Sequence, residues 1–141
     1  MAHQPRTRRS KPGTWYEDIK ETDACGPVRH DSRIEYDDVE KLIDHFGDEF
    51  PRVKAVDIYT NGTYCYGVGF HYQGGYDPGV HLVQPLPDGV ECERFELDDD
   101  EYIVKMKART GAWVDEIELI TNKGRDFDKG GQGGGANDID F

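Results

Sequence analysis

Alternating apolar and polar positions dominate the middle of this chain and predict short β-strands. Residues 53–60 (VKAVDIYT) and 63–72 (TYCYGVGFHY) both follow this pattern. Successive side chains of a strand point to opposite faces of its sheet. The second segment should therefore place its larger side chains on one face, namely Tyr64, Tyr66, Val68 and Phe70. Its other face should carry Cys65, Gly67, Gly69 and His71.

Further strands are predicted at about residues 90–97 and 101–109, on either side of the acidic turn at 98–100. Residues 73–89 are rich in Gly and Pro and predict a long loop. The seventeen glycines and eight tyrosines of the chain suit strands joined by tight turns. The pattern therefore predicts an all-β protein.

One short helix is predicted near residues 38–50. Four apolar residues recur there with the spacing of one helix face: Val39, Leu42, Ile43 and Phe46. Asp37 or Asp38 can serve as the N-cap, Gly47 can end the helix, and Pro51 follows it. We expect this helix to cover one end of the β structure.

The chain also contains an internal repeat. GTWYEDI begins at Gly13, GTYCYGV at Gly62 and GAWVDEI at Gly111, so that the three glycines are spaced evenly, and each begins a strand-like run. A repeat of this period is typical of a fold assembled from similar units.

Length and charge limit the possible partners. The 141 residues fit one domain, which we place at 13–141, after a flexible basic tail at 1–12. The formal net charge of -12 disfavours nucleic acid and an anionic membrane as partners, because both would repel the chain. A localisation signal and an extra edge strand are alternative roles for the tail.

The amino terminus and the cysteines indicate a reducing compartment. The basic tail lacks a following hydrophobic stretch, so we expect no secretory signal and a cytoplasmic protein. The three cysteines, Cys25, Cys65 and Cys92, cannot all pair within one chain, and we expect free thiols.

The candidate site combines a strand entrance with a glycine cluster. Asp115 follows Gly111 at the start of a strand, and five glycines come after that strand at 130–135. A carboxylate offers two acceptor oxygens, and a glycine run lets main-chain N–H groups approach a ligand. Trp113 can cover an apolar ring face. Together these groups suit the recognition of vicinal sugar hydroxyls.

These residues resemble the jacalin-related lectins, and among them the griffithsin-like members. The matching segments are LDDDEYI at 97–103, GAWVD at 111–115, TNKG at 121–124 and GGQGG at 130–134. The resemblance implies a β-prism I fold, with three four-stranded Greek-key sheets related by pseudo-threefold symmetry. It also implies a non-catalytic lectin that binds a mono- or oligosaccharide of the mannose or glucose type and needs no cofactor and no metal.

The resemblance assigns the site residue by residue. The carbohydrate-binding residues would be Gly111, Ala112, Trp113, Val114, Asp115, Gly130 and Gly131. In that assignment Asp115 accepts from two hydroxyls, and the amides of Trp113, Val114, Gly130 and Gly131 donate. A possible second site has a motif one residue longer and comprises Gly13, Trp15, Tyr16, Asp18 and Gly26. A shallow site of this kind is weak alone, so a homo-oligomer is a companion expectation.

Other parts of the chain depart from the family pattern. Tyr66 stands where the second repeat would carry the acid, and Arg29 and His30 stand where glycines are expected. The chain also ends before a further strand pair. Either residues 13–21 take the place of that pair in a circular permutation, or a partner completes the fold.

Two other functions are alternatives to sugar binding by a lectin. A jacalin-fold interaction module that has lost sugar binding would fit the substitutions at Tyr66, Arg29 and His30. A glycan-processing enzyme would need an acid/base pair, and the sequence indicates none.

A metal site formed by Cys65, His71, His81 and Cys92 matches no compact zinc spacing, and a calcium site at Asp138 or Asp140 is not expected.

Overall fold

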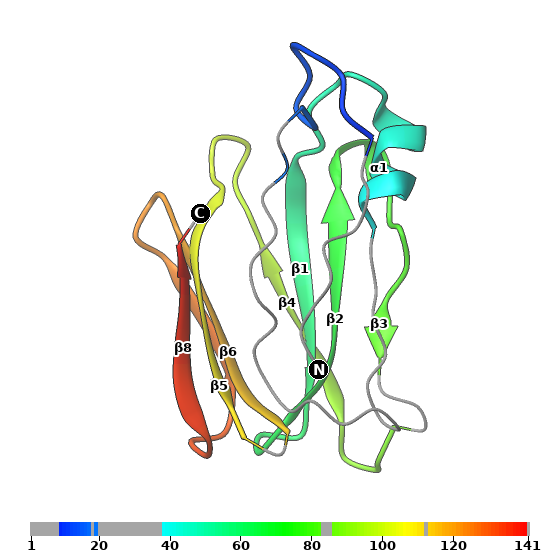
Figure 1. Cartoon of the computed structure of the whole chain (residues 1–141). Helices are drawn as coiled ribbons and strands as arrows, with labels where there is room; N and C mark the ends of the chain where they lie inside the picture. Colours follow the sequence, from blue (N-terminus) through cyan, green and yellow to red (C-terminus); the bar gives the residue numbers. More distant parts are fainter. Residues whose placement is uncertain (1–8, 18, 20–37, 83–85, 112, 141) are drawn as a thin grey trace, which may run out of the picture.

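Two four-stranded antiparallel sheets and one short helix make up the described structure (Figure 1). The computed structural model describes residues 9–17, 19, 38–82, 86–111 and 113–140. In chain order the elements are α1 Val39–Phe46, β1 Val53–Thr60, β2 Cys65–Tyr72, the 3-10 turn Gln73–Gly75, β3 His81–Leu82, β4 Glu91–Glu96, β5 Ile103–Thr110, β6 Val114–Thr121, β7 Asp126–Gly130 and β8 Gly135–Asp140.

The two sheets have the same topology. Sheet A has the strand order β3-β2-β1-β4 and sheet B has the order β7-β6-β5-β8. The apolar core lies between them, where Val56 and Ile58 of β1 and Leu119 of β6 are buried. Phe95 of β4 stacks on Phe127 of β7 with ring centroids 4.9 Å apart, which ties the sheets together. The strands predicted at 53–60, 63–72, 90–97 and 101–109 are therefore confirmed as β1, β2, β4 and β5, whereas β7 and β8 were not predicted. The loop predicted at 73–89 is interrupted by the short strand β3.

The sequence repeat is visible as a repeated β-bulge. In sheet A, Tyr59 pairs with Gly67 and Thr60 pairs with Cys65, which leaves Tyr66 as the extra residue. In sheet B, Arg109 pairs with Glu116 and Thr110 pairs with Val114, which leaves Asp115 as the extra residue. The second and third repeats thus form equivalent structures.

The bulge changes one predicted strand face. Strict alternation places Cys65 with Gly67 and His71, away from Val68 and Phe70. In the structure Cys65 instead packs against the core together with Val68 and Phe70. The prediction was wrong for Cys65 because the extra residue of a bulge shifts the alternation by one position.

The helix is confirmed, although it is shorter than 38–50. Leu42 and Ile43 are buried, and the Gly47 N–H donates to Ile43 O at 2.8 Å with Gly47 at φ 60°, as expected for a helix end. Asp38 precedes the helix but makes no capping hydrogen bond from its side chain. Its carboxylate lies 2.6 Å from His81 Nε2 instead, which ties the start of α1 to β3.

The first sequence repeat does not form a strand over residues 13–17. Two consecutive turns form there, closed by Thr14 N–H to Lys11 O and by Glu17 N–H to Thr14 O. The Trp15 indole donates to Gly47 O at 2.9 Å, so this segment packs on the end of α1. The strand predicted from Gly13 is therefore wrong over these residues, because local turn bonds and the helix end satisfy the backbone and the indole. Residues 18 and 20–37 lie outside the described part.

Ion pairs hold residues 9–11 to the helix region. Arg9 pairs with Glu40 and with Asp44, and Lys11 Nζ lies 3.0 Å from Asp48. These pairs are exposed and each contributes little to stability. Among the described residues, no helix is long and apolar enough to cross a membrane.

Candidate functional site

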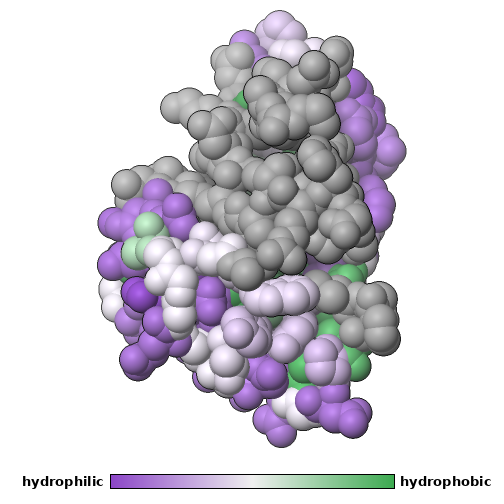
Figure 2. Space-filling view, turned by 60° about the horizontal axis from the view of Figure 1, so that its bottom comes forward, coloured by the Kyte–Doolittle hydropathy of each residue, from purple (hydrophilic) through white to green (hydrophobic). Residues whose placement is uncertain are grey.

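Three connections meet at the end of the molecule drawn at the bottom of Figure 1. They are the tip of the β1–β2 hairpin at 61–64, the β5–β6 turn at 111–113 and the β7–β8 loop at 131–134. Figure 2 turns this end forward. The repeat explains the arrangement, because equivalent turns of sheets A and B point the same way.

The Asp115 carboxylate lies against the glycine loop. The residue is only 7% exposed. A Cβ built on Gly133 would lie 2.5 Å from Asp115 Oδ1, and one built on Gly134 would lie 2.6 Å from Oδ2. Any side chain at these two positions would collide with the carboxylate. The loop is therefore glycine-rich so that the acid can sit directly beside its backbone.

The start of the loop wraps around the backbone of Asp115. The Gly131 N–H donates to Asp115 O at 2.7 Å. Gly130 has φ 121°, and a Cβ there would lie 2.1 Å from the same carbonyl oxygen. On its other side Gly131 faces the β1–β2 hairpin, where a Cβ would lie 2.5 Å from Thr63 O. The Gly131 amide, expected to donate to a ligand, already donates within the chain.

Arg109 holds the far side of the loop. Its Nε donates to Gly133 O at 3.0 Å and its Nη2 to Gly134 O at 3.1 Å. Sequence reasoning missed this residue. Arg109 reaches the loop because it pairs with Ala136, just after the loop, in the β5–β8 register. That pairing is known only once β5 and β8 are placed side by side.

The site presents free acceptors next to free donors. Within the described residues no group donates a hydrogen bond to the Asp115 carboxylate, and the amides of Gln132, Gly133 and Gly134 donate to none. No buried side-chain oxygen of the described part lacks a partner, so both Asp115 carboxylate oxygens reach the surface. An acceptor pair beside unpaired N–H groups suits a ligand that carries both hydroxyl donors and hydroxyl acceptors.

Trp113 provides an aromatic surface beside the acid. Its side chain is 51% exposed, and its carbonyl accepts from the Gly111 N–H at 3.0 Å, which closes the turn. Val114 begins β6 and is half-buried. Ala112 lies outside the described residues. The structure thus brings Gly111, Trp113, Asp115, Gly130 and Gly131 to one end of sheet B.

The equivalent position of sheet A lacks the acid. Tyr66 occupies the bulge there, and its hydroxyl lies 3.3 Å from Asn61 Nδ2. This is the outcome expected from the second sequence repeat, in which Tyr66 replaces the aspartate.

The residues proposed for a second site lie elsewhere. Gly13, Trp15 and Tyr16 form part of the turn segment beside α1, at the end of the molecule opposite Asp115 (Figure 1). Tyr16 is buried, and the Trp15 N–H is already bonded to the helix end. The remaining members, Asp18 and Gly26, lie outside the described residues.

The thiols and histidines have structural surroundings. Cys65 and Cys92 are free, and burial raises the pKa of the Cys65 thiol to about 11, which makes it a poor nucleophile. His71 Nε2 lies 2.7 Å from Asp57, and His81 is paired with Asp38. In the parts of the chain that the structure describes, no group of three or more His, Cys, Asp or Glu side chains is placed to hold a metal ion.

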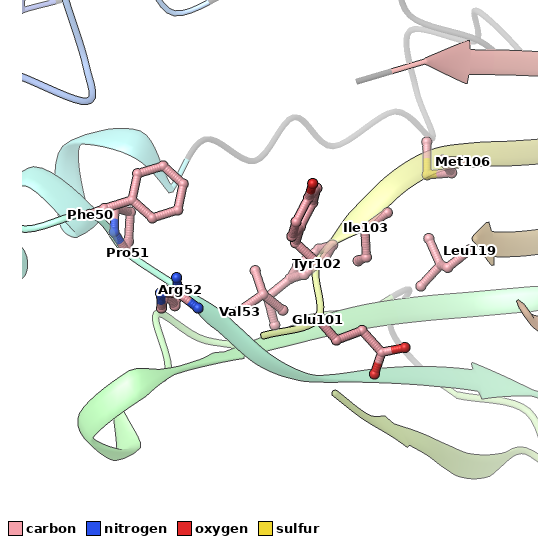
Figure 3. Close-up of a pocket in the computed structure, with 10 residues that line it drawn as sticks. Phe50, Pro51, Arg52, Val53, Glu101, Tyr102, Ile103, Met106 and Leu119 are labelled. Atoms are coloured by element: carbon pink, nitrogen blue, oxygen red, sulfur yellow. The ribbon is translucent and has the colours of Figure 1, made fainter. Parts of the chain in front are cut away.

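A cavity of about 530 Å³ lies between the sheets, toward the beginnings of β1 and β5 (Figure 3). Its lining is mainly apolar and includes Val53, Ile103, Met106 and Leu119, which belong to the core. Its acid, Glu101, is bonded to Thr121 and Arg125, both at 2.7 Å. The cavity therefore continues the core and offers no free carboxylate to a ligand.

Comparison with solved structures shows where this fold occurs. A prostate-specific WGA16 glycoprotein lectin matches with a TM-score of 0.57 and 18% identity over 66% of this chain and 64% of its own. Frutalin from Artocarpus incisa, in complex with galactose, matches with a TM-score of 0.56 and 20% identity over 64% of this chain and 74% of its own. Artocarpin, a lectin with mannose specificity, matches with a TM-score of 0.55 and 20% identity over 64% of this chain and 68% of its own.

The chain spans less than two thirds of the length of the WGA16 lectin. A search of curated protein sequences gives no match. Residues 35–141, however, match the family described as the Jacalin-like lectin domain. Because this match covers most of the chain, including both sheets and the glycine loop, the protein belongs to the jacalin-like lectin domain family.

Proposed function

We propose that this protein is a non-catalytic lectin that binds a hexose between Asp115 and the glycine loop. The observation that carries the proposal is the Asp115 carboxylate, nearly buried yet accepting no hydrogen bond from a described residue. Both oxygens reach the surface, so they can accept hydrogen bonds from two hydroxyls of a ligand. The amides of Gln132, Gly133 and Gly134 can donate to the ring or hydroxyl oxygens, and Trp113 covers an apolar ring face.

A mannose or glucose preference is part of the proposal. It is supported by the resemblance of GAWVD and GGQGG to the mannose-binding griffithsin-like motif. The similar solved structures include a galactose complex and a mannose-specific lectin, so the fold itself is compatible with either sugar type. A glycan array that includes mannose, glucose and galactose termini tests this preference directly.

Binding without catalysis is supported by the composition of the site. Glycoside hydrolysis requires two carboxyl groups about 5–9.5 Å apart on opposite sides of the bond. Here the group that faces Asp115 across the site is glycine backbone. Asp115 is therefore an acceptor of hydroxyl hydrogen bonds and has no partner acid in the loop.

Calorimetry on matched variants tests the proposal. Hydrogen bonds to a charged group contribute about 1.5–3 kcal/mol each, so Asp115→Asn should weaken hexose binding about a hundredfold. Asp126→Asn is the matched control, because Asp126 is exposed on β7 away from the loop. Equal affinity of wild type and Asp115→Asn would contradict the proposal. A folded wild type that binds no glycan would favour the interaction module, which the tyrosine at position 66 already suggests for sheet A.

A homo-oligomer accompanies this function. A single shallow sugar site binds at around millimolar concentrations, which corresponds to about 4 kcal/mol, and several sites on one particle raise the effective affinity. Sedimentation analysis measures the oligomeric state. Binding to a glycan-coated surface that is no tighter than binding to the free sugar would contradict multivalency.

A three-sheet prism is the proposed complete fold. The apolar cavity between sheets A and B is the side that a third sheet would cover, and covering it would bury the exposed rims of Phe50 and Tyr102. A covered cavity predicts that the folded protein does not bind the dye ANS. Strong ANS fluorescence at neutral pH would mean that this side is open.

A further inference from the structure

The tip of the β1–β2 hairpin contains an asparagine followed by a glycine. Of the three asparagines of the chain, Asn61, Asn122 and Asn137, Asn61 is the one with glycine after it, at position 62. In such a pair the main-chain nitrogen of the glycine can attack the side-chain amide of the asparagine, because the glycine has no Cβ in the way. Both residues are exposed, and a Cβ on Gly62 would meet nothing within 4 Å. The pair is therefore open to water and unhindered by side chains.

Hydrogen bonds at the tip prepare the Asn61 amide for this attack. Its Oδ1 accepts from the N–H groups of Thr63 and Tyr64, both at 2.9 Å. Two main-chain donors on one carbonyl oxygen form the arrangement of an oxyanion hole, which stabilises the negative charge that develops when a nucleophile adds to the carbonyl carbon. The N–H of Gly62, whose proton must leave, donates to the Thr60 hydroxyl oxygen at 2.9 Å. Both reacting groups are thus positioned by the turn itself.

The leaving group of this reaction faces a hydroxyl. Asn61 Nδ2 donates to the Tyr66 hydroxyl oxygen at 3.3 Å. Once the glycine nitrogen has added, Nδ2 becomes an amine with a lone pair, and the same hydroxyl can then donate a proton to it. Tyr66 can therefore assist the departure of ammonia.

The turn between β6 and β7 provides a comparison within the same chain. Asn122 also follows a threonine, and the N–H of the next residue, Lys123, donates to the Thr121 hydroxyl oxygen at 3.3 Å. Here, however, Oδ1 accepts from the Tyr102 N–H at 2.8 Å in place of two tip amides, and Nδ2 donates to the Asp100 carbonyl, which has no proton to give. The residue that would attack also carries a lysine side chain. The β6–β7 turn therefore lacks what the hairpin tip provides.

We propose that Asn61 and Gly62 form a self-modification site, at which the chain converts its own asparagine to aspartate and isoaspartate. The Gly62 nitrogen bonds to Asn61 Cγ, the Cγ–Nδ2 bond breaks, and ammonia leaves with the proton that the Gly62 nitrogen gives up. A cyclic imide remains. Water then opens the imide at either carbonyl, which yields aspartate or, with the main chain running through Cβ and Cγ, isoaspartate. The reaction consumes only water.

The modification takes place next to the proposed hexose site. Thr63, two residues after Asn61, lies so close to the glycine loop that a Cβ on Gly131 would be 2.5 Å from Thr63 O. Gly131 in turn donates to Asp115 O. Isoaspartate lengthens the main chain just before this contact, so it should move Thr63 and loosen the loop beside the acid. Hexose affinity should therefore fall as the protein ages. This consequence rests on the proposed function, whereas the modification itself does not.

Peptide mass spectrometry of the full chain after incubation at neutral pH tests the site. Asn61 should convert to a mixture of aspartate and isoaspartate, whereas Asn122 and Asn137 should remain asparagine. Aspartate without isoaspartate at position 61 would overturn the cyclic imide. An intact Asn61, or equal conversion of all three asparagines, would overturn the site.

A tyrosine variant tests whether the surroundings assist the reaction. Tyr66→Phe should slow the conversion of Asn61 about three- to tenfold, as expected for the loss of one neutral hydrogen bond. Tyr64→Phe is the matched control, because the hydrogen bonds that join Asn61 to Tyr64 use only the Tyr64 backbone. Equal rates in the wild type and Tyr66→Phe would overturn the role of the hydroxyl.

Calorimetry on fresh and incubated protein tests the consequence for sugar binding. The incubated wild type should lose hexose binding in proportion to the converted fraction. Asn61→Ser cannot form the imide, and its hydroxyl can still accept from the tip amides, so its affinity should not change with incubation. Conversion of Asn61 with unchanged hexose affinity would overturn the consequence and leave the modification intact. A fresh wild type that binds no hexose would overturn the proposed function, while the mass spectrum would still decide the modification.

Discussion

Sheets A and B share one topology and one bulge, yet only sheet B carries an acid at the bulge position. The bulge residue is Tyr66 in sheet A and Asp115 in sheet B. The connection after β7 reads GQGG at 131–134, whereas the equivalent connection of sheet A, VQPLPDGV at 83–90, contains a single glycine. The scaffold therefore supplies the position, and the bulge residue together with the adjoining loop determines whether that position can recognise hydroxyls.

The buried acids of the two sheets, Asp57 and Asp115, also differ in their hydrogen-bond partners. Asp57, on β1 of sheet A, accepts two hydrogen bonds from Arg94, at 2.7 and 3.0 Å, and lies 2.7 Å from His71. Asp115 of sheet B accepts none from the described residues. A fully partnered acid stabilises the fold, and an unpartnered acid at the surface of a pocket is available to a ligand. The hydrogen-bond partners separate structural from binding carboxylates more clearly than burial does.

Blocking the Asp115 carboxylate of sheet B should cause the largest loss of hexose affinity. In Gly133→Ala the new methyl would lie 2.5 Å from Asp115 Oδ1, so it should displace the acid and abolish measurable hexose binding. Gly135→Ala is the matched control, because its methyl would come no closer than 3.9 Å to Thr110 O. Calorimetry measures both. Wild-type affinity in Gly133→Ala would mean that the carboxylate does not contact the sugar.

Removing the charge of the sheet A acid should affect stability and spare binding. Asp57→Asn leaves Arg94 and His71 without their carboxylate and should lower the free energy of unfolding by about 2 kcal/mol. Urea unfolding measures this loss. Asp115→Asn should change stability far less, because no described partner is lost. Equal destabilisation by both substitutions would break the proposed division between structural and binding acids.

Acid should remove the contribution of Asp57. Hydrogen bonds from Arg94, and next from His71, hold the pKa of the Asp57 carboxyl below its ordinary value, although burial acts in the opposite direction. A lowered folded-state pKa stabilises the protein above the unfolded pKa of about 3.9, and this stabilisation is lost as the pH falls through the folded value. The stability difference between wild type and Asp57→Asn should therefore be constant at neutral pH and shrink below about pH 4. A difference that grows in acid would contradict this assignment.

Loosening the glycine loop should cause a moderate loss of hexose affinity. Arg109→Gln removes two charge-assisted hydrogen bonds to Gly133 O and Gly134 O, so the loop samples more conformations before binding. Hexose affinity should fall about three- to tenfold. Lys107→Gln is a suitable control, since Lys107 lies on the same strand two residues before and pairs across to Glu118 and Asp138. An unchanged affinity in Arg109→Gln would show that the loop needs no anchor.

Restoring the acid of sheet A alone should have the smallest effect. Tyr66→Asp recreates the G-x-x-x-D pattern at 62–66, but the neighbouring connection still carries prolines at 85 and 87 instead of a glycine loop. The stoichiometry of hexose binding should stay at one site per chain, as measured by calorimetry. A second site of equal affinity would mean that the acid is sufficient without the glycine loop.

The sequence alone determined strands β1, β2, β4, β5 and β6, the helix, the equivalence of the second and third repeats and the pairing of Asp115 with a glycine cluster, whereas β3, β7 and β8 were not predicted. Each of these depends on residue type at fixed spacing, because side-chain periodicity and glycine freedom act locally. The first repeat shows the limit of such patterns. GTWYEDI resembles a strand entrance, yet residues 13–17 form turns because Trp15 and Gly13 find hydrogen-bond partners at Gly47 and Glu17.

Only the tertiary structure decided which groups around the acid are free and which are occupied. The bulge at Asp115, the bonds from Arg109 to the loop, the contact of Thr63 with Gly131 and the ring contact of Trp113 with Tyr64 all depend on strand register. Register is a non-local property, since it is set by how strands distant in sequence pack their apolar faces together. The sequence therefore indicates which residue types form the site, and the packing of the two sheets determines how these residues are arranged.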